Sequence, residues 1–165
     1  MKQVVLGLGG NEGDVVEVLT VALDKVGNDI GEISIKSSLY QTKAWGVENQ
    51  PDFINMVVSL KTSKTAEEVL KLCLSIEKEL GRNRIGVKKW HQRVIDIDVL
   101  FYADEVIDLP HLKVPHPYVQ ERNFVLVPLA EILPNNIHPQ FKKSFVQLKN
   151  ESKDVQKVIL LDSEI

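Results

Sequence analysis

Two aspartates spaced two positions apart, Asp96 and Asp98, are the residues of this sequence best suited to chemistry. They lie in a β-branched and aliphatic run, 94–101, that predicts a buried strand with both carboxylates on one face, their Cα atoms roughly 6.5 to 7 Å apart. Paired carboxylates repel unless a cation is near, and Mg²⁺ is commonly held by one or two carboxylates together with water and substrate phosphates. A magnesium site is therefore one prediction, and a solvated polar face of an edge strand is the alternative. The opposite face of this strand is expected to carry Ile95, Ile97, Val99 and Phe101.

The segment immediately before this strand, residues 82–93, is strongly basic in a protein whose net charge is −3. Its five cationic side chains, unaccompanied by any acidic one, are Arg82, Arg84, Lys88, Lys89 and Arg93. Cations beside a metal site are suited to binding a polyphosphate, and Gly86 indicates a loop that can close as a lid. The alternative is an ordinary solvated loop.

Two other features have a possible role in binding. His116 lies between Pro115 and Pro117, which restrict its position, so it could contact a phosphate or a base; an ordinary loop histidine is the alternative. The Gly7-x-Gly9 pattern has Glu12 where a dinucleotide-binding fingerprint requires its third glycine. A tight turn into a capped helix is the better interpretation of the glycine-rich segment near residue 9.

Length and composition exclude several classes of protein. The 165 residues predict a single domain over 1–165, with a core at about 1–134 and a C-terminal extension, 135–165, that offers no chemistry. The net charge gives no indication of nucleic acid or an anionic membrane as partner. The one cysteine, Cys73, is expected in the core; it excludes an internal disulfide and fits a reducing cytoplasm. The N-terminal residues resemble neither a signal peptide nor a membrane span, so we expect a cytoplasmic protein.

Helix signals occur twice in the first half of the chain. Capping-box patterns begin at Asp14 and at Thr65, and an apolar stripe of helical period follows each. Gly27 and Gly81 are the predicted ends of these helices.

Strand signals combine with these helices into the order βαββαβ. The predicted strands are 3–8, 33–40, 53–60 and 94–101. This order is typical of an α+β, ferredoxin-like fold, in which helices pack on an antiparallel sheet. In the third strand, the alternate residues Ile54 to Leu60 are expected to face the core. The topology should gather these segments at one end of the sheet: 9–11, 40–46, Phe53, Asn55, Asp96 and Asp98.

The second half of the chain is less regular. Residues 109–117 are predicted as an extended loop, and short helical segments are expected on either side of Pro128. An apolar run at 155–161 could add a strand. His111 and His138 have no partners at metal-ligand spacing and are expected at the surface.

Several separated segments, in order over roughly residues 4–134, closely resemble one family. That family is 6-hydroxymethyl-7,8-dihydropterin pyrophosphokinase of folate biosynthesis. The matching segments are 9–14, 40–42, Gly46 with 50–55, 77–84, 93–100, 115–117 and 121–132.

The resemblance implies transfer of the β,γ-pyrophosphoryl group of ATP to the hydroxymethyl oxygen of the pterin, with release of AMP. We expect the protein to be a monomer. It implies that Asp96 and Asp98 bind two Mg²⁺ ions that bridge the triphosphate. The catalytic residues that it implies are Arg82, Arg93, Asp96 and Asp98. The ATP-binding residues that it implies are Glu77, Arg82, Arg84, Trp90, Arg93, Val99, His116 and Arg122. The pterin-binding residues that it implies are Thr42, Ala44, Trp45, Gly46, Phe53, Asn55, Asp96 and Phe124.

Two other functions fit parts of the same pattern. A palm-type nucleotidyl transferase or cyclase also places paired carboxylates on a ferredoxin-like sheet, but it would release pyrophosphate. A ligand-sensing or RNA-binding module on the same fold would use exposed aromatic residues and a basic face. The acidic net charge and the buried setting predicted for the aspartates argue against that module. Within the family pattern, His91-Gln92 is an unusual approach to the aspartate strand, where glycine and proline are usual.

Overall fold

The computed structural model describes residues 1–44, 49–81, 94–162 and 165. Its strands are β1 (Lys2–Gly10), β2 (Glu32–Lys36), β3 (Tyr40–Thr42), β4 (Phe53–Thr62), β5 (Asp96–Tyr102), β6 (Ile107–Leu109), β7 (Leu112–Val114) and β8 (Ile159–Leu160). Its helices are α1 (Val15–Asp29), α2 (Ala66–Glu79), α3 (Asn123–Ile132), α4 (Phe145–Glu151) and a short 3-10 helix, η1 (Val119–Glu121). The main sheet is antiparallel in the order β5-β1-β4-β3-β8, with β2 also paired to β4, and β6 and β7 form a separate hairpin.

The predicted order βαββαβ and the ferredoxin-like α+β fold are confirmed. One predicted strand, 33–40, is interrupted, because the chain leaves the ladder at Ser37. Its hydroxyl accepts a hydrogen bond from Val57 N (2.9 Å) while its own amide donates to Val57 O (2.9 Å). The serine side chain thus replaces a backbone acceptor, and β2 and β3 pair with β4 on either side of this site.

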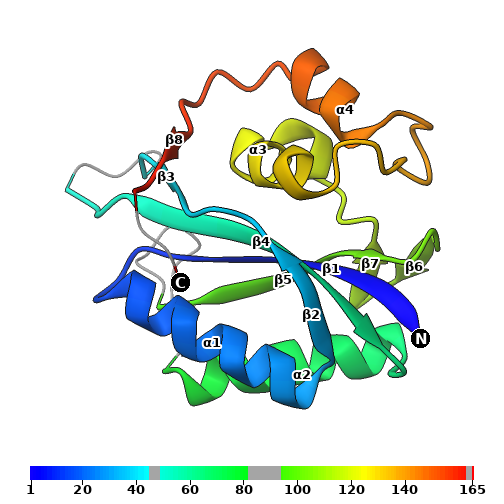
Figure 1. The fold of residues 1–165 in the computed structure, drawn as a ribbon, viewed down its shortest axis with the longest axis horizontal. Helices are drawn as coiled ribbons and strands as arrows, with labels where there is room; N and C mark the ends of the chain where they lie inside the picture. Colours follow the sequence, from blue (N-terminus) through cyan, green and yellow to red (C-terminus); the bar gives the residue numbers. More distant parts are fainter. Residues whose placement is uncertain (45–48, 82–93, 163–164) are drawn as a thin grey trace.

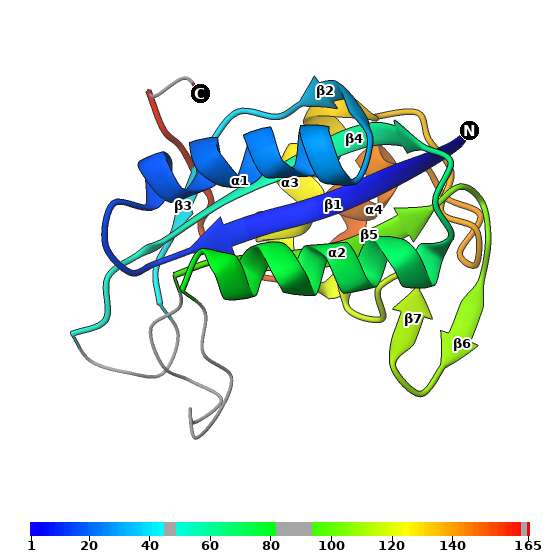
Figure 2. The same ribbon diagram turned by 90° about the horizontal axis from the view of Figure 1, so that it is seen from below.

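Helices α1 and α2 cover one face of the sheet, as Figures 1 and 2 show. Their apolar stripes pack on alternate residues of the strands, among them Leu6, Met56 and Ile97, which are at most 2% exposed. The capping box at Thr65 is complete, and Gly81 has the positive φ of 95° expected where a helix ends. The prediction that α1 ends at Gly27 is wrong: the helix continues to Asp29, because Ile30 beyond it is buried in the core.

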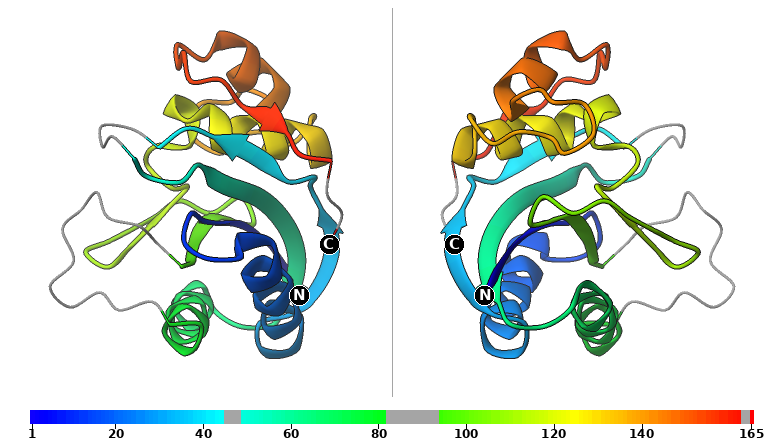
Figure 3. Two further views of the ribbon diagram at one scale, coloured as in Figure 1. Left: turned by 90° about the vertical axis from the view of Figure 1, so that its left-hand side faces the viewer. Right: turned by 90° about the vertical axis from the view of Figure 1, so that its right-hand side faces the viewer.

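Helices α3 and α4 lie over the other face, so the sheet is the middle of three layers (Figure 3). A second apolar cluster joins them to the sheet through residues that include Val57, Leu100 and Leu126. The prediction of short helical segments around Pro128 is wrong, since α3 runs through it unbroken. Packing of the mostly apolar helix compensates for the one N–H that proline cannot donate. The apolar run at 155–161 does add a strand, β8, over two residues.

A register shift in β5 changes which residues face which layer. Val5 and Leu6 of β1 pair with Phe101 and Val99, which leaves Leu100 as an extra residue between them. Ile95, Ile97 and Val99 face α1 and α2 as predicted, but Phe101 belongs to the cluster under α3 and α4. The prediction for Phe101 is wrong because the bulge reverses the alternation.

The two histidines expected at the surface differ. His111 is exposed and pairs with Glu67, whereas His138 is only 1% exposed, so the prediction for His138 is wrong. Its ring packs on Phe101 and Phe141, and its Nδ1 accepts hydrogen bonds from two backbone amides, those of Gln140 and Phe141. Burial of its ring therefore contributes to the core of the α3–α4 layer.

Two further observations concern the single cysteine and the possibility of a membrane-spanning helix. Cys73 is fully buried, as predicted, and burial raises the pKa of its thiol to about 12, so the thiol is unreactive. Among the described residues, no helix is both long and apolar enough to cross a membrane.

Candidate active site

A cavity of about 390 Å³ lies at one end of the sheet, on the face covered by α3. Strands β1, β4 and β5 form its floor, and the start of α3, the end of β3 and the C-terminal segment form its walls. The described residues around it are Gly7, Leu8, Gly9, Thr42, Lys43, Gln50, Phe53, Asn55, Met56, Val57, Asp96, Asp98, Leu100, Glu121, Arg122, Phe124, Val125, Asp154 and Gln156.

Two glycines of β1 make the floor of this cavity open. In the ladder Gly9 pairs with Asn55 on one side and with Asp96 on the other, and Gly7 lies in the same way between Val57 and Asp98. A Cβ atom on Gly9 would lie 2.1 Å from Asn55 Oδ1, so only glycine lets the asparagine side chain cover this position. The glycines thus leave space between a polar amide on one strand and two carboxylates on another.

Asp96 and Asp98 project from β5 into the cavity, on the face opposite the α1–α2 core, as their spacing predicts. Asp96 is partly buried and Asp98 is exposed. Within the part of the chain that the structure describes, no group of three or more His, Cys, Asp or Glu side chains could hold a metal by itself. Two carboxylates nevertheless fit Mg²⁺, which takes its remaining oxygen ligands from water and substrate phosphates.

Glu77 of α2 supports this strand from the other layer of the molecule. Its side chain is 1% exposed, and its Oε1 accepts a hydrogen bond from the backbone N of Ile97 (2.7 Å), between the two aspartates. Strand β5 is at the edge of the sheet, and the hydrogen bond to Glu77 shows that the Ile97 amide is on its outer side, away from β1. Glu77 therefore fixes the segment that carries both carboxylates.

Aromatic and polar side chains line the rest of the cavity. Phe53, at the start of β4, and Phe124, in the first turn of α3, both border it, as do Thr42 and Asn55. Flat rings with a few fixed polar groups are typical of a site for a planar heterocycle. The guanidinium of Arg122 lies 5.7 Å from the centroid of the Phe124 ring, which places a cation at the same wall.

His116 is a neutral hydrogen-bonding group in this structure. Burial, with a smaller contribution from the charge of Arg122, lowers the pKa of His116 to about 4. Its Nδ1 accepts from Tyr118 N (3.3 Å), so the ring proton is on Nε2. His116 can therefore donate one hydrogen bond to an oxygen atom without carrying a charge at neutral pH.

The structure brings together much of the predicted site. Thr42, Phe53, Asn55, Asp96, Asp98, Arg122 and Phe124 border one cavity. His116 and Ala44 are described but do not border it, and Glu77 is buried beneath β5. The side chain of Val99 is buried in the α1–α2 core, so a nucleotide contact there would be made by its backbone. The predicted residues Trp45, Gly46, Arg82, Arg84, Trp90 and Arg93 lie outside the described residues.

Sequence reasoning missed several residues around the cavity. Gly7 was predicted within the first strand but without a role in the site, and Gly9 was predicted in a turn, although both lie within β1. Their two-residue spacing in a strand next to Asp-x-Asp was the signal for an open floor. Asp154 and Gln156 come from the C-terminal extension, where no local pattern indicates that the chain returns to the site.

Solved structures with the same fold include wild-type HPPK-DHPS of Plasmodium falciparum with pteroate. It has a TM-score of 0.74 at 18% sequence identity, and the match covers 91% of this chain and 44% of that one. At this identity the likeness shows the fold alone, and this chain spans less than half the length of that protein.

Sequence relatives are much closer. The 2-amino-4-hydroxy-6-hydroxymethyldihydropteridine pyrophosphokinase of Aquifex aeolicus is 45% identical over 152 residues, which are 92% of this chain and 93% of its own length. The protein of the same name from Synechocystis is 42% identical over 145 residues, 87% of this chain and 73% of its own length.

The family model for 7,8-dihydro-6-hydroxymethylpterin-pyrophosphokinase (HPPK) matches residues 5–134. This range begins within β1 and extends past the end of α3, and it contains Asp96, Asp98 and both phenylalanines of the cavity. The chain therefore belongs to the 7,8-dihydro-6-hydroxymethylpterin-pyrophosphokinase family.

Proposed function

We propose that this chain transfers the β,γ-pyrophosphoryl group of ATP to the hydroxymethyl oxygen of 6-hydroxymethyl-7,8-dihydropterin and releases AMP, a step of folate biosynthesis. The pterin oxygen forms a bond to the β-phosphorus, the bond from that phosphorus to the α-phosphate oxygen breaks, and the hydroxyl proton is released. One observation supports the proposal: the family model matches residues 5–134, and within this range the paired carboxylates border an aromatic-walled cavity.

The phosphate half of the site is assigned to Asp96 and Asp98 together with basic residues. Their carboxylates would hold two Mg²⁺ ions, which would screen the triphosphate charge and keep the reacting atoms in line. Arg122 and His116 supply a cation and a neutral donor near this end of the sheet. The remaining phosphate and nucleotide contacts are assigned to Glu77, Val99 and the segment with Arg82, Arg84, Trp90 and Arg93.

The pterin half is assigned to the opposite part of the cavity. Phe53 and Phe124 sandwich the planar ring, while Asn55 and Thr42 bond its polar edge, and the support for this is that all four border one cavity. Ala44, Trp45 and Gly46, which follow Thr42 in the chain, are assigned to the same half. Asp96 borders both halves, because its neighbour in the ladder, Gly9, pairs with Asn55.

For the protein as a whole we propose a single domain over residues 1–165 that acts as a cytoplasmic monomer with ATP and the pterin as its small-molecule substrates. Two apolar clusters that share one sheet support the single domain.

The direct test is to incubate the protein with ATP, Mg²⁺ and 6-hydroxymethyl-7,8-dihydropterin and to separate the nucleotides. We expect one AMP for each pterin diphosphate formed, and no AMP when the pterin is omitted. Release of ADP would indicate single phosphoryl transfer, and release of pyrophosphate would indicate a nucleotidyl transferase or cyclase; either result would overturn the proposal.

A further inference from the structure

The C-terminal strap, defined here as residues 152–161, runs from the end of α4 across the open side of the cavity to β3. It lies outside the range 5–134 that the family model matches. Its end is fixed to the sheet, since β8 pairs with β3 and Leu161 N donates to Leu39 O (2.9 Å). Figure 1 shows the strap passing beside α3 on its way to β3.

Asp154 connects the strap to the start of α3. Helix α3 begins after Arg122, whose side chain makes no capping hydrogen bond. Asp154 Oδ2 accepts from Asn123 N (2.8 Å), and Asp154 O accepts from Asn123 Nδ2 (2.9 Å). A carboxylate at a helix N-terminus satisfies an amide that lacks an intrahelical partner and opposes the helix dipole. The residue after Asn123 is Phe124, so Asp154 holds the turn that presents this ring to the cavity.

Gln156 connects the strap to the other wall. Its Nε2 donates to the carbonyl of Lys43 (2.8 Å), the residue after Thr42. Its backbone N donates to Asp154 Oδ1 (2.9 Å), so one carboxylate contacts both the start of α3 and the strap residue that reaches β3.

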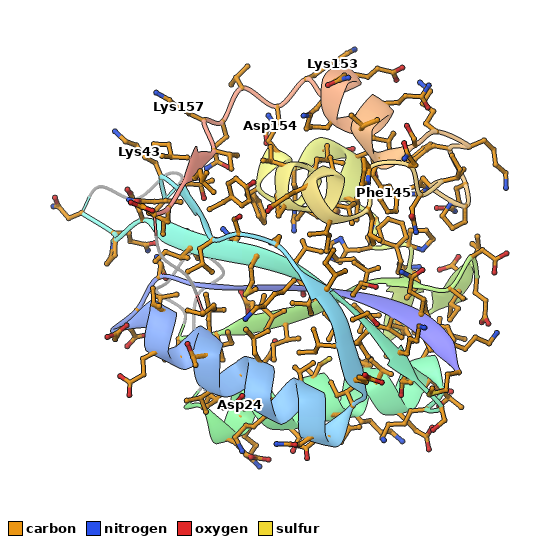
Figure 4. All side chains as sticks on the ribbon, in the orientation of Figure 1. Asp24, Lys43, Phe145, Lys153, Asp154 and Lys157 are labelled. Carbon is orange, nitrogen blue, oxygen red and sulfur yellow. The ribbon has the colours of Figure 1, made fainter. Side chains whose placement is uncertain are left out.

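Exposure alternates along the strap in agreement with these contacts. Asp154 and Gln156 are partly buried and border the cavity, whereas Lys153 and Lys157 are exposed. Figure 4 shows the side chains of Lys153 and Lys157 directed away from α3. The strap thus has an inner face with two polar contacts and an outer face in solvent.

From these contacts we infer that Asp154 and Gln156 are positioning residues of the pterin half of the site, which set the separation between Phe124 on α3 and Thr42 on β3. The inference rests on the proposed function. The strap stabilises the bound geometry of both walls before the pterin enters, so its loss weakens pterin binding more than ATP binding.

The test compares inner-face and outer-face variants in steady-state assays with each substrate varied in turn. We expect Asp154→Ala to raise the KM for the pterin about tenfold and Gln156→Ala about threefold, with the KM for ATP changed less than about twofold. Asp154→Asn keeps one acceptor oxygen and should lie between the wild type and Asp154→Ala. The outer-face controls Lys153→Ala and Lys157→Ala should leave both KM values unchanged.

Calorimetric titration of each variant with the pterin, in the presence of a non-hydrolysable ATP analogue, supplies an independent readout. A pterin affinity equal to the wild type in both inner-face variants would overturn the inference, as would equal losses for pterin and ATP. If Asp154→Ala proves unfolded by circular dichroism, the Asp154→Asn and Gln156→Ala variants decide the question. Failure of the proposed function is distinguishable, because the wild type itself would then release no AMP.

Discussion

On the α1–α2 face of the sheet, apolar side chains from the strands pack beneath two amphipathic helices; on the α3–α4 face, the same strands present glycines, an asparagine and two aspartates to a cavity. In β4, Met56 and Val58 are buried on the first face while Phe53 and Asn55 border the cavity on the second. Because side chains of a strand alternate between faces, one short segment can stabilise the fold and carry the site independently. Substitutions on the α1–α2 face should therefore lower mainly the stability of the protein. Substitutions on the cavity face should lower mainly its activity.

The largest expected effect is at the paired carboxylates. Asp96→Ala and Asp98→Ala should each lower kcat/KM by at least about 10³-fold through loss of the Mg²⁺ ligand, while the unfolding midpoint in urea stays close to the wild-type value. Asp104→Ala, at an exposed position just after β5, is the control and should retain normal activity. Near-normal turnover of either variant at saturating Mg²⁺ would contradict the metal assignment.

The second prediction compares one variant from each face in both pterin binding and stability. Phe124→Ala removes a ring from the cavity wall and should weaken pterin binding about 10- to 100-fold, with ATP binding largely unchanged. Leu19 is a fully buried residue of α1, and Leu19→Ala should lower the free energy of unfolding by about 2 to 5 kcal/mol and leave both affinities unchanged. Calorimetry and urea denaturation of both variants test the comparison, and a loss of ATP affinity in Phe124→Ala would refute the ring-stacking role.

Glu77 is an exception to this division between the two faces. It belongs to α2, on the core side of the sheet, but it holds the strand that carries both aspartates. Glu77→Ala leaves the Ile97 amide without its side-chain acceptor and should reduce kcat/KM about tenfold and stability by about 1 to 3 kcal/mol. Glu77→Gln keeps an acceptor oxygen and should recover most of both losses. Glu79→Ala, at an exposed surface ion pair, controls for removal of a helix glutamate.

Comparison of Glu77→Gln with Glu77→Ala also distinguishes two roles for Glu77: support of β5 and a contact with the nucleotide. If Glu77→Gln is as impaired as Glu77→Ala, the negative charge itself is required, and a role toward the nucleotide rather than toward β5 would be favoured. Measuring the KM for ATP in both variants distinguishes these outcomes.

The same difference between faces explains what the sequence could predict. The caps and apolar stripes of α1 and α2 are local signals, and for these two helices only the end of α1 differs from the prediction. The α3–α4 face depends on contacts between distant residues: Asp154 caps a helix that begins 31 residues earlier, and a bulge at Leu100 turns Phe101 toward α3. Neither the cap nor the bulge has a local pattern, so single-sequence reasoning found Asp96 and Asp98 but not the wall built by the C-terminal strap.

The smallest expected effect is a pH dependence of stability in the α3–α4 layer. Burial lowers the pKa of His138 from 6.5 to about 4, and protonation of Nδ1 would also break its bonds with the amides of Gln140 and Phe141. Below pH 6.5 the unfolded chain binds a proton that the folded chain does not, so this contribution is complete above about pH 6.5 and is lost as the pH falls toward 4.

Urea denaturation at pH 7.5 and pH 5 measures this loss, and we expect His138 to account for about 1 kcal/mol of it. His138→Asn retains a side-chain acceptor for the two amides but has no group that titrates in this range. The variant should be less stable at pH 7.5, through lost ring packing, yet lose less stability than the wild type between the two pH values. His111→Asn changes an exposed histidine and is the matched control. If His138→Asn loses as much stability as the wild type between pH 7.5 and pH 5, the buried ring is not a source of acid sensitivity. In that case the α3–α4 layer would respond to pH in the same way as the apolar layer on the opposite face.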